Sequence, residues 1–149
     1  MRAVLQRVSA ASVTVEHQVV GEIGRGFLVL LGVVEGDTES DLDYIVDKTV
    51  AMRVFPDAVG RMNVDIGGAN GALLVVSQFT LAGDCRKGRR PSWDGAARPE
   101  AAEAWYERAI AAWQARGLQV RSGVFRADMQ VALVNDGPVT LLLDSRKQF

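Results

Sequence analysis

Apolar and polar residues follow two different periods in the first third of the chain. They alternate from Val4 to Val20 around His17-Gln18, which predicts a β-hairpin. A continuous apolar run from Phe27 to Val33, bounded by glycines, predicts a buried strand. The period then becomes helical after Asp37-Thr38, with apolar residues at Leu42, Ile45, Val46 and Val50. We therefore expect one amphipathic helix there, with Thr38 and Asp41 as its capping pair.

The second half of the chain repeats this change of period. Residues 60–71 hold glycines and little pattern, and Ala72 to Val76 predicts a buried strand that ends at Ser77. Pro99 is suited to the first position of a helix that Gly117 ends. One face of this helix carries Ala102, Trp105, Tyr106, Ala109, Ile110 and Trp113. Residues 118–125, 130–134 and 139–143 predict three further strands, which gives a mixed α/β order.

Composition narrows the class of protein without naming a partner. The chain has 149 residues, enough for one domain that buries roughly 70% of its unfolded surface. Its 17 basic and 18 acidic residues nearly cancel. No apolar run is long enough to span a bilayer and the first residues do not form a signal peptide, so we expect a soluble cytoplasmic protein. Cys85 is the only cysteine, which excludes an internal disulfide.

The segment Ser77-Gln78-Phe79-Thr80 lies where a buried strand is predicted to end. Backbone amides at such a point can stabilise an oxyanion, with Gln78 and Thr80 as orienting groups and water as the attacking species. The alternative is an ordinary strand terminus in which Phe79 packs. The only histidine, His17, is expected in a turn, and His, Cys and carboxylates show no metal-ligand spacing, so neither a Ser-His-Asp triad nor a metal or other cofactor is predicted.

Two further segments suggest binding surfaces. In Leu133 to Leu142, Gly137-Pro138 separates two apolar runs, so its backbone can form a surface; the alternative is a simple hairpin turn. The second segment is the cationic loop, residues 86–90, whose cations are Arg86, Lys87, Arg89 and Arg90. It suits phosphates of a nucleic acid backbone, and the alternative is a solvated loop.

At these residues the chain resembles the D-aminoacyl-tRNA deacylase family. Ser77-Gln78-Phe79-Thr80-Leu81 and Asn135-Asp136-Gly137-Pro138-Val139-Thr140 are similar to its two signature motifs. The resemblance extends to residues 1–8, 90–92 and 123–129, in the same order and over almost the whole chain. It implies a single domain over residues 1–149 with an α/β fold, in which two main amphipathic helices pack on a mixed, mostly antiparallel, curved and barrel-like sheet.

The resemblance also implies an activity and a site. Members are homodimers that hydrolyse the ester between a D-amino acid, or glycine, and the 3′ end of tRNA, without a metal or other cofactor and without a membrane. Gly137-Pro138 is expected to be cis and to enter the partner's pocket, where it leaves no room for an L side chain. Ser77, Gln78, Phe79 and Thr80 are expected to line the opposite wall, with the amides of Phe79 and Thr80 facing the scissile carbonyl. The substrate's own 2′-hydroxyl would activate water.

The remaining assignments are less direct. Arg7 is similar to a family position that locks the dimer near the Gly-Pro segment, and an exposed strand arginine is the alternative. Arg126 and Trp93 depart from the family pattern, and Arg126 is interpreted either as a tRNA contact or as a salt-bridge partner. Residues 144–149 are expected to form a polar tail. Two other functions stay open: an ester hydrolase with Thr80 as nucleophile, and a non-catalytic binder of the tRNA 3′ end.

Overall fold

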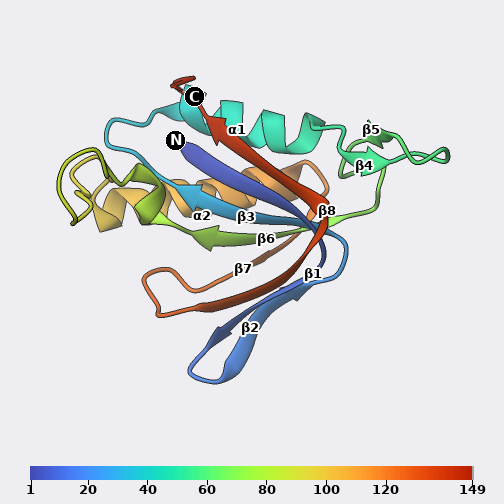
Figure 1. Ribbon diagram of the computed structural model, residues 1–149, viewed down its shortest axis with the longest axis horizontal. Coiled ribbons are helices and arrows are strands. Elements are labelled where there is room, and N and C mark those ends of the chain that lie inside the picture. Colours follow the sequence, from blue (N-terminus) through green and yellow to red (C-terminus); the bar gives the residue numbers. More distant parts are fainter. Residues whose placement is uncertain (149) are drawn as a thin grey trace.

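The computed structural model describes residues 1–148, which form a curved mixed sheet covered by two helices (Figure 1). The elements in chain order are β1 (Arg2–Val15), β2 (Gln18–Ile23), β3 (Gly26–Gly32), α1 (Glu39–Ala51), β4 (Phe55–Pro56), β5 (Met62–Val64), β6 (Ala72–Ser77), the 3₁₀ helix η1 (Phe79–Ala82), α2 (Pro99–Ala115), β7 (Gln119–Ser122) and β8 (Gln130–Asp144). The predicted fold class is confirmed.

The long strand β1 organises the sheet. It pairs antiparallel with β2, β3 and β8, while β3, β6 and β7 pair in parallel. Parallel neighbours need long connections, and α1 and α2 lie in the two crossovers, from β3 to β6 and from β6 to β7. This arrangement places the carboxyl ends of β3 and β6 side by side, with Leu31 opposite Ser77.

Each face of the sheet has its own apolar core because side chains alternate along the strands. One core joins the helices to one set of strand residues and includes Phe27, Leu73, Ile45, Tyr106 and Trp113. The other lies where β1, β2 and β8 curl over the opposite face, and includes Val8, Leu28, Leu74 and Val131. The curl therefore closes a small barrel-like interior on the side away from the helices.

The sequence signals of α1 are confirmed at its first turn. Thr38 is the N-cap, and the Asp41 carboxylate accepts hydrogen bonds from the Thr38 amide and hydroxyl, each at 2.8 Å. This satisfies an amide that the helix leaves without an acceptor.

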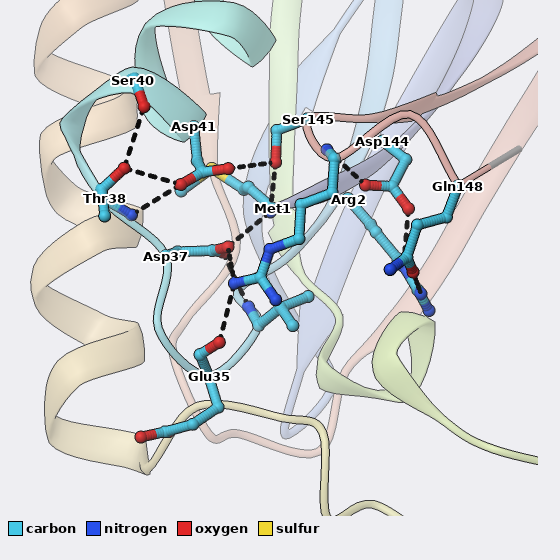
Figure 2. Close-up of polar contacts among 12 residues, drawn as sticks. Met1, Arg2, Glu35, Asp37, Thr38, Ser40, Asp41, Asp144, Ser145 and Gln148 are labelled. Carbon is cyan, nitrogen blue, oxygen red and sulfur yellow. Dashed lines mark hydrogen bonds and ion pairs between the residues drawn. The ribbon is translucent and has the colours of Figure 1, made fainter.

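Polar contacts around Met1 join both chain ends to this turn (Figure 2). The buried Met1 ammonium donates to Asp37 Oδ1 and to Ser145 Oγ, both at 2.6 Å. Ser145 donates in turn to Asp41 at 2.6 Å, and Arg146 lies 3.1 Å from Asp37. Polar side chains of residues 144–148, in the expected polar tail, therefore bind the rest of the fold, and Phe149 lies outside the described residues.

Three sequence predictions of secondary structure are wrong in detail. Residues 118–125 contain only the short strand β7, and residues 60–71, whose sequence shows little pattern, contain the strand β5, which was not predicted. Residues 130–134 and 139–143 belong to one continuous strand, β8, and not to two. The reason is that β1 is long enough to pair with both parts of β8 in the same antiparallel direction.

The Gly-Pro segment is thus a bulge in β8 and not a hairpin turn. Gln6 pairs with Thr140 and Val8 with Asn135, so the four residues 136–139 lie opposite the single residue Arg7. We call residues 136–139 the Gly-Pro bulge. Such a bulge keeps the strand direction while lifting its extra residues away from the ladder.

Candidate active site

The segment predicted to carry the chemistry borders a cavity of about 650 Å³. Ser77 ends β6, and the Gln78 amide donates to the Leu31 carbonyl at 2.8 Å, so the end of β3 fixes the chain before it enters η1. Ser77, Gln78 and Phe79 all line the cavity, whereas Thr80 lies next to them without lining it. The cavity wall continues over α2 and the turn after β7 with Ala97, Arg98, Pro99, Ala102, Tyr106, Phe125, Arg126, Ala127 and Met129.

Phe79 is the more exposed of two exposed aromatic residues that line this cavity, the other being Trp93. Its side chain is 57% exposed, and its ring meets Trp93 edge-on, with centroids 5.4 Å apart. Gly83 makes the contact of Trp93 with η1 feasible, because a Cβ there would lie 2.5 Å from the Trp93 ring. An apolar surface left open beside a cavity is typical of a binding site.

None of the side chains of residues 77–80 can act as a base that removes a proton from the Thr80 hydroxyl. Gln78 Nε2 donates to the Thr80 hydroxyl, and an amide cannot remove a proton from it. The amides of Phe79 and Thr80 begin η1, so they have no acceptor in the hydrogen-bond pattern of that helix. The corner can therefore donate hydrogen bonds to a carbonyl oxygen, and it offers Thr80 no activating partner.

Tyr106 closes the inner wall of the cavity. Its hydroxyl donates to the Val75 carbonyl at 2.8 Å on the strand that leads to Ser77. Burial raises the pKa of Tyr106 to about 12, so the hydroxyl stays protonated and keeps its role as a donor. The hydrogen bond therefore ties α2 to β6 just before the corner.

Arg7, on the neighbouring strand β1, binds the Gly-Pro bulge. Its guanidinium is almost buried and donates to the main-chain carbonyls of Asp136, at 3.2 Å, and Val54. It also forms an ion pair with the Asp136 carboxylate, at 3.1 Å. Asn135 closes the neck of the bulge: in the amide orientation that satisfies both its ends, it donates to the carbonyls of Arg7 and Val139, at 3.0 and 3.1 Å.

These contacts hold Gly137 and Pro138 at an exposed corner. The peptide bond between them is cis, and Gly137 has a φ of +119°, which disfavours any residue with a side chain. A Cβ at Gly137 would also lie 2.8 Å from Arg7 Nη2. Neither residue lines the cavity beside Ser77. One chain therefore brings the Ser77–Thr80 residues together and leaves Gly137 and Pro138 apart from them.

The cationic loop is a separate exposed surface. An antiparallel bridge between Asp84 and Ser92 closes it at its base. Arg86 is held by Asp84, at 2.6 Å, and hydrogen bonds and charge from Arg86 keep the pKa of Asp84 well below its usual range. One of the four cations is thus neutralised, which leaves Lys87, Arg89 and Arg90 toward solvent.

The other residues singled out in the sequence lie elsewhere on the surface or in the wall of the cavity. His17 occupies the exposed β1–β2 turn, with a φ of +65°, and Cys85 is an exposed free thiol. Across residues 1–148, no three His, Cys, Asp or Glu side chains gather as a metal site would need, and no helix is long and apolar enough to cross a membrane. Arg126 lines the cavity together with Arg98 and Trp93, which sequence reasoning did not assign to the site. Asn135, which was predicted only as part of a signature motif, supports the Gly-Pro bulge.

Comparisons with known proteins give one consistent result. The family model described as D-Tyr-tRNA(Tyr) deacylase matches residues 4–144. Proteins named D-aminoacyl-tRNA deacylase from Desulfitobacterium hafniense and Anaeromyxobacter dehalogenans are each 58% identical over 149 residues, which is 100% of both chains.

Two solved structures share the fold. The c-Myc DNA Unwinding Element Binding Protein matches with a TM-score of 0.91 and 39% identity, over 97% of this chain and 98% of that one. A probable eukaryotic D-amino acid tRNA deacylase matches with a TM-score of 0.81 and 19% identity, over 96% and 98% of the two chains. At that identity the second likeness concerns the fold alone.

Proposed function

The chain belongs to the D-Tyr-tRNA(Tyr) deacylase family and is a hydrolase of ester bonds, and we propose that it removes D-amino acids and mischarged glycine from the 3′ end of tRNA. The observation that carries the proposal is the corner Ser77–Thr80. It joins unpaired backbone amides to an apolar cavity and contains no protein base.

We propose that the ester carbonyl lies at this corner. The amides of Phe79 and Thr80 donate to its oxygen, and their hydrogen bonds strengthen as negative charge develops there in the transition state. Water attacks the carbonyl carbon, the bond to the ribose 3′ oxygen breaks, and that oxygen leaves with a proton. The 2′-hydroxyl of the terminal adenosine activates the water. This is consistent with a corner in which the Thr80 hydroxyl is hydrogen-bonded by the Gln78 amide and not by a base.

Chiral selection is proposed to come from a second copy of the chain. Gly137 and Pro138 of one protomer enter the cavity of its partner, and their carbonyls hold the substrate's amino group and fill the space of an L side chain. Glycine has no side chain, so it passes the same filter. The exposed position of the Gly-Pro bulge and its rigid support by Arg7 favour this arrangement.

The edge of the sheet supports a homodimer. Within residues 1–148, β8 pairs only with β1, so one side of a 15-residue strand lacks a neighbour. The strand β8 also carries two exposed apolar residues, Val134 and Leu142, each about 60% exposed. Long edges with exposed apolar residues are normally covered. A second copy that covers β8 would also bring its Gly-Pro bulge close to this chain.

Arg86, Lys87, Arg89 and Arg90 are proposed to contact the tRNA backbone in the cytoplasm. The Arg86–Asp84 pair reduces the charge available to phosphates, so a positioning contact suits the loop better than a broad groove. The Thr80-nucleophile alternative is less favoured, because the partner of its hydroxyl is the Gln78 amide and not a base.

The deciding experiment offers matched D-aminoacyl-, L-aminoacyl- and glycyl-tRNA to the purified protein. We expect hydrolysis of the D and glycyl substrates and survival of the L substrate. Equal hydrolysis of D and L would overturn the chiral filter. A D substrate without the terminal 2′-hydroxyl should fail, whereas a Thr80 nucleophile predicts a trapped acyl-enzyme and an inactive Thr80→Val variant.

A further inference from the structure

The cavity beside Ser77 has an uneven distribution of charge. Among its lining residues only Arg98 and Arg126 are charged, and both are cations. The rest are apolar or neutral, and include aromatic rings of Phe79, Trp93 and Tyr106. A protein of net charge −1 thus places two positive charges and no carboxylate around the mainly apolar cavity beside the proposed chemistry.

Arg98 and Arg126 are among the arginines of residues 1–148 that form no ion pair with a carboxylate, as Arg89, Arg90 and Arg121 also are. Arg2, Arg7, Arg86, Arg108, Arg116 and Arg146 each form an ion pair with a carboxylate. Within residues 1–148, the guanidinium groups of Arg98 and Arg126 form neither an ion pair nor a hydrogen bond, although Asp128 is only two residues from Arg126. The salt-bridge interpretation of Arg126 therefore finds no support.

The backbone at both positions is fixed from different elements. Arg98 is the N-cap of α2, and its carbonyl accepts the Ala102 amide at 2.9 Å. Arg126 lies in the turn after β7 with a φ of +62°, where the Ala127 amide donates to Val124 at 3.2 Å. Two cations from two elements thus line one cavity, and each has a guanidinium free to bind an oxyanion.

We propose that Arg98 and Arg126 form an anion subsite for the 5′-phosphate of the substrate's terminal nucleotide. The inference rests on the proposed function, which places the ester at Ser77–Thr80. The phosphate of the same nucleotide is only one ribose away from that ester, so it lies within reach of long side chains that line the same cavity. The subsite positions the ester and takes no part in the chemistry.

The test measures binding of two non-hydrolysable analogues to the purified full-length protein. Both are 3′-D-alanylamino-3′-deoxyadenosine, and one of them carries a 5′-phosphate. In low salt we expect the wild type to bind the phosphorylated analogue about tenfold more tightly, which corresponds to about 1.4 kcal/mol. The preference should disappear in the Arg98→Gln, Arg126→Gln double variant, while affinity for the unphosphorylated analogue stays within about twofold.

Arg121→Gln is the matched control. Arg121 is an exposed arginine on β7 that does not line the cavity, so its loss should keep the preference. Lysine at positions 98 and 126 should keep part of it, because the charge remains. Equal affinity of the wild type for both analogues, or a preference that survives the double variant, would overturn the subsite.

The subsite and the proposed function fail in different ways. If only the subsite is wrong, the wild type still binds both analogues equally and still hydrolyses D-aminoacyl-tRNA. If neither analogue binds and D-aminoacyl-tRNA persists, both proposals are overturned.

Discussion

Replacing Arg7 by methionine tests whether the Gly-Pro bulge needs its support. Methionine keeps an apolar stem and removes the guanidinium, which is almost buried and serves two main-chain carbonyls and the Asp136 carboxylate. Hydrogen bonds from a charged donor contribute about 1.5–3 kcal/mol each. The carboxylate is half-exposed, so its ion pair adds at most about 1 kcal/mol. We expect the free energy of unfolding to fall by at least about 3 kcal/mol.

The same variant should lose activity and selectivity beyond its loss of stability. A displacement of about 1 Å at a positioning group can lower the rate about 100-fold. Urea unfolding at fixed protein concentration measures the free energy of unfolding, and single-turnover hydrolysis of D- and L-aminoacyl-tRNA measures activity and selectivity.

Two controls accompany the Arg7 variant. Asp136→Asn removes only the half-exposed ion pair and should cost less than about 1 kcal/mol. Arg121→Met makes the same chemical change on the exposed face of β7 and should change neither quantity. An Arg7→Met protein with wild-type stability and an unchanged ratio of D to L hydrolysis would refute the reasoning.

Three other variants test single residues of the site and of the start of α1. Phe79→Ala should change the free energy of unfolding by less than about 1 kcal/mol, because the ring is 57% exposed. It should nevertheless lower D-aminoacyl-tRNA hydrolysis at least about tenfold. A loss of hydrolysis no larger than the loss of folded protein would contradict the place of Phe79 in the site. Gly137→Ala meets a φ of +119° and Arg7 at 2.8 Å, so we expect about 1–3 kcal/mol of strain, seen as a lower unfolding midpoint, and a weaker preference for D over L. Burial raises the pKa of Asp41, but hydrogen bonds from Ser145 and the N-cap residue outweigh it and lower the pKa to about 2. The advantage of wild type over Asp41→Asn in urea unfolding should therefore be complete above about pH 4 and disappear as the pH falls toward 2, whereas an advantage independent of pH would be inconsistent with this.

Periodicity predicted the elements whose pattern is local. The Thr38–Asp41 pair marks the start of α1, and the apolar face around Tyr106 and Trp113 marks α2, because both signals are contained within one helix. The strand ending at Ser77 was also predicted, since buried parallel strands are continuous apolar runs.

Long-range pairing could not be predicted in the same way. The segment 130–144 contains Gly-Pro, which is normally a turn signal, and only the length of β1 makes it a bulge within one strand. The neutral partner of Thr80 and the position of Arg98 in the cavity wall likewise depend on contacts between separate segments. The motifs identified the site, whereas the partners of its residues required the fold.

The meeting of the two chain ends has a practical consequence for rearranged versions of this protein. Adjacent termini normally make circular permutation easy. Here a linker that joins the last residue to Met1 would turn the ammonium beside Asp37 into an uncharged amide. Among residues 1–148, this buried carboxylate would then keep Arg146 as its one remaining counterion. A fusion partner joined ahead of Met1 would do the same, so affinity handles for purification are better inserted at the exposed tip of residues 86–90 when binding is not being assayed.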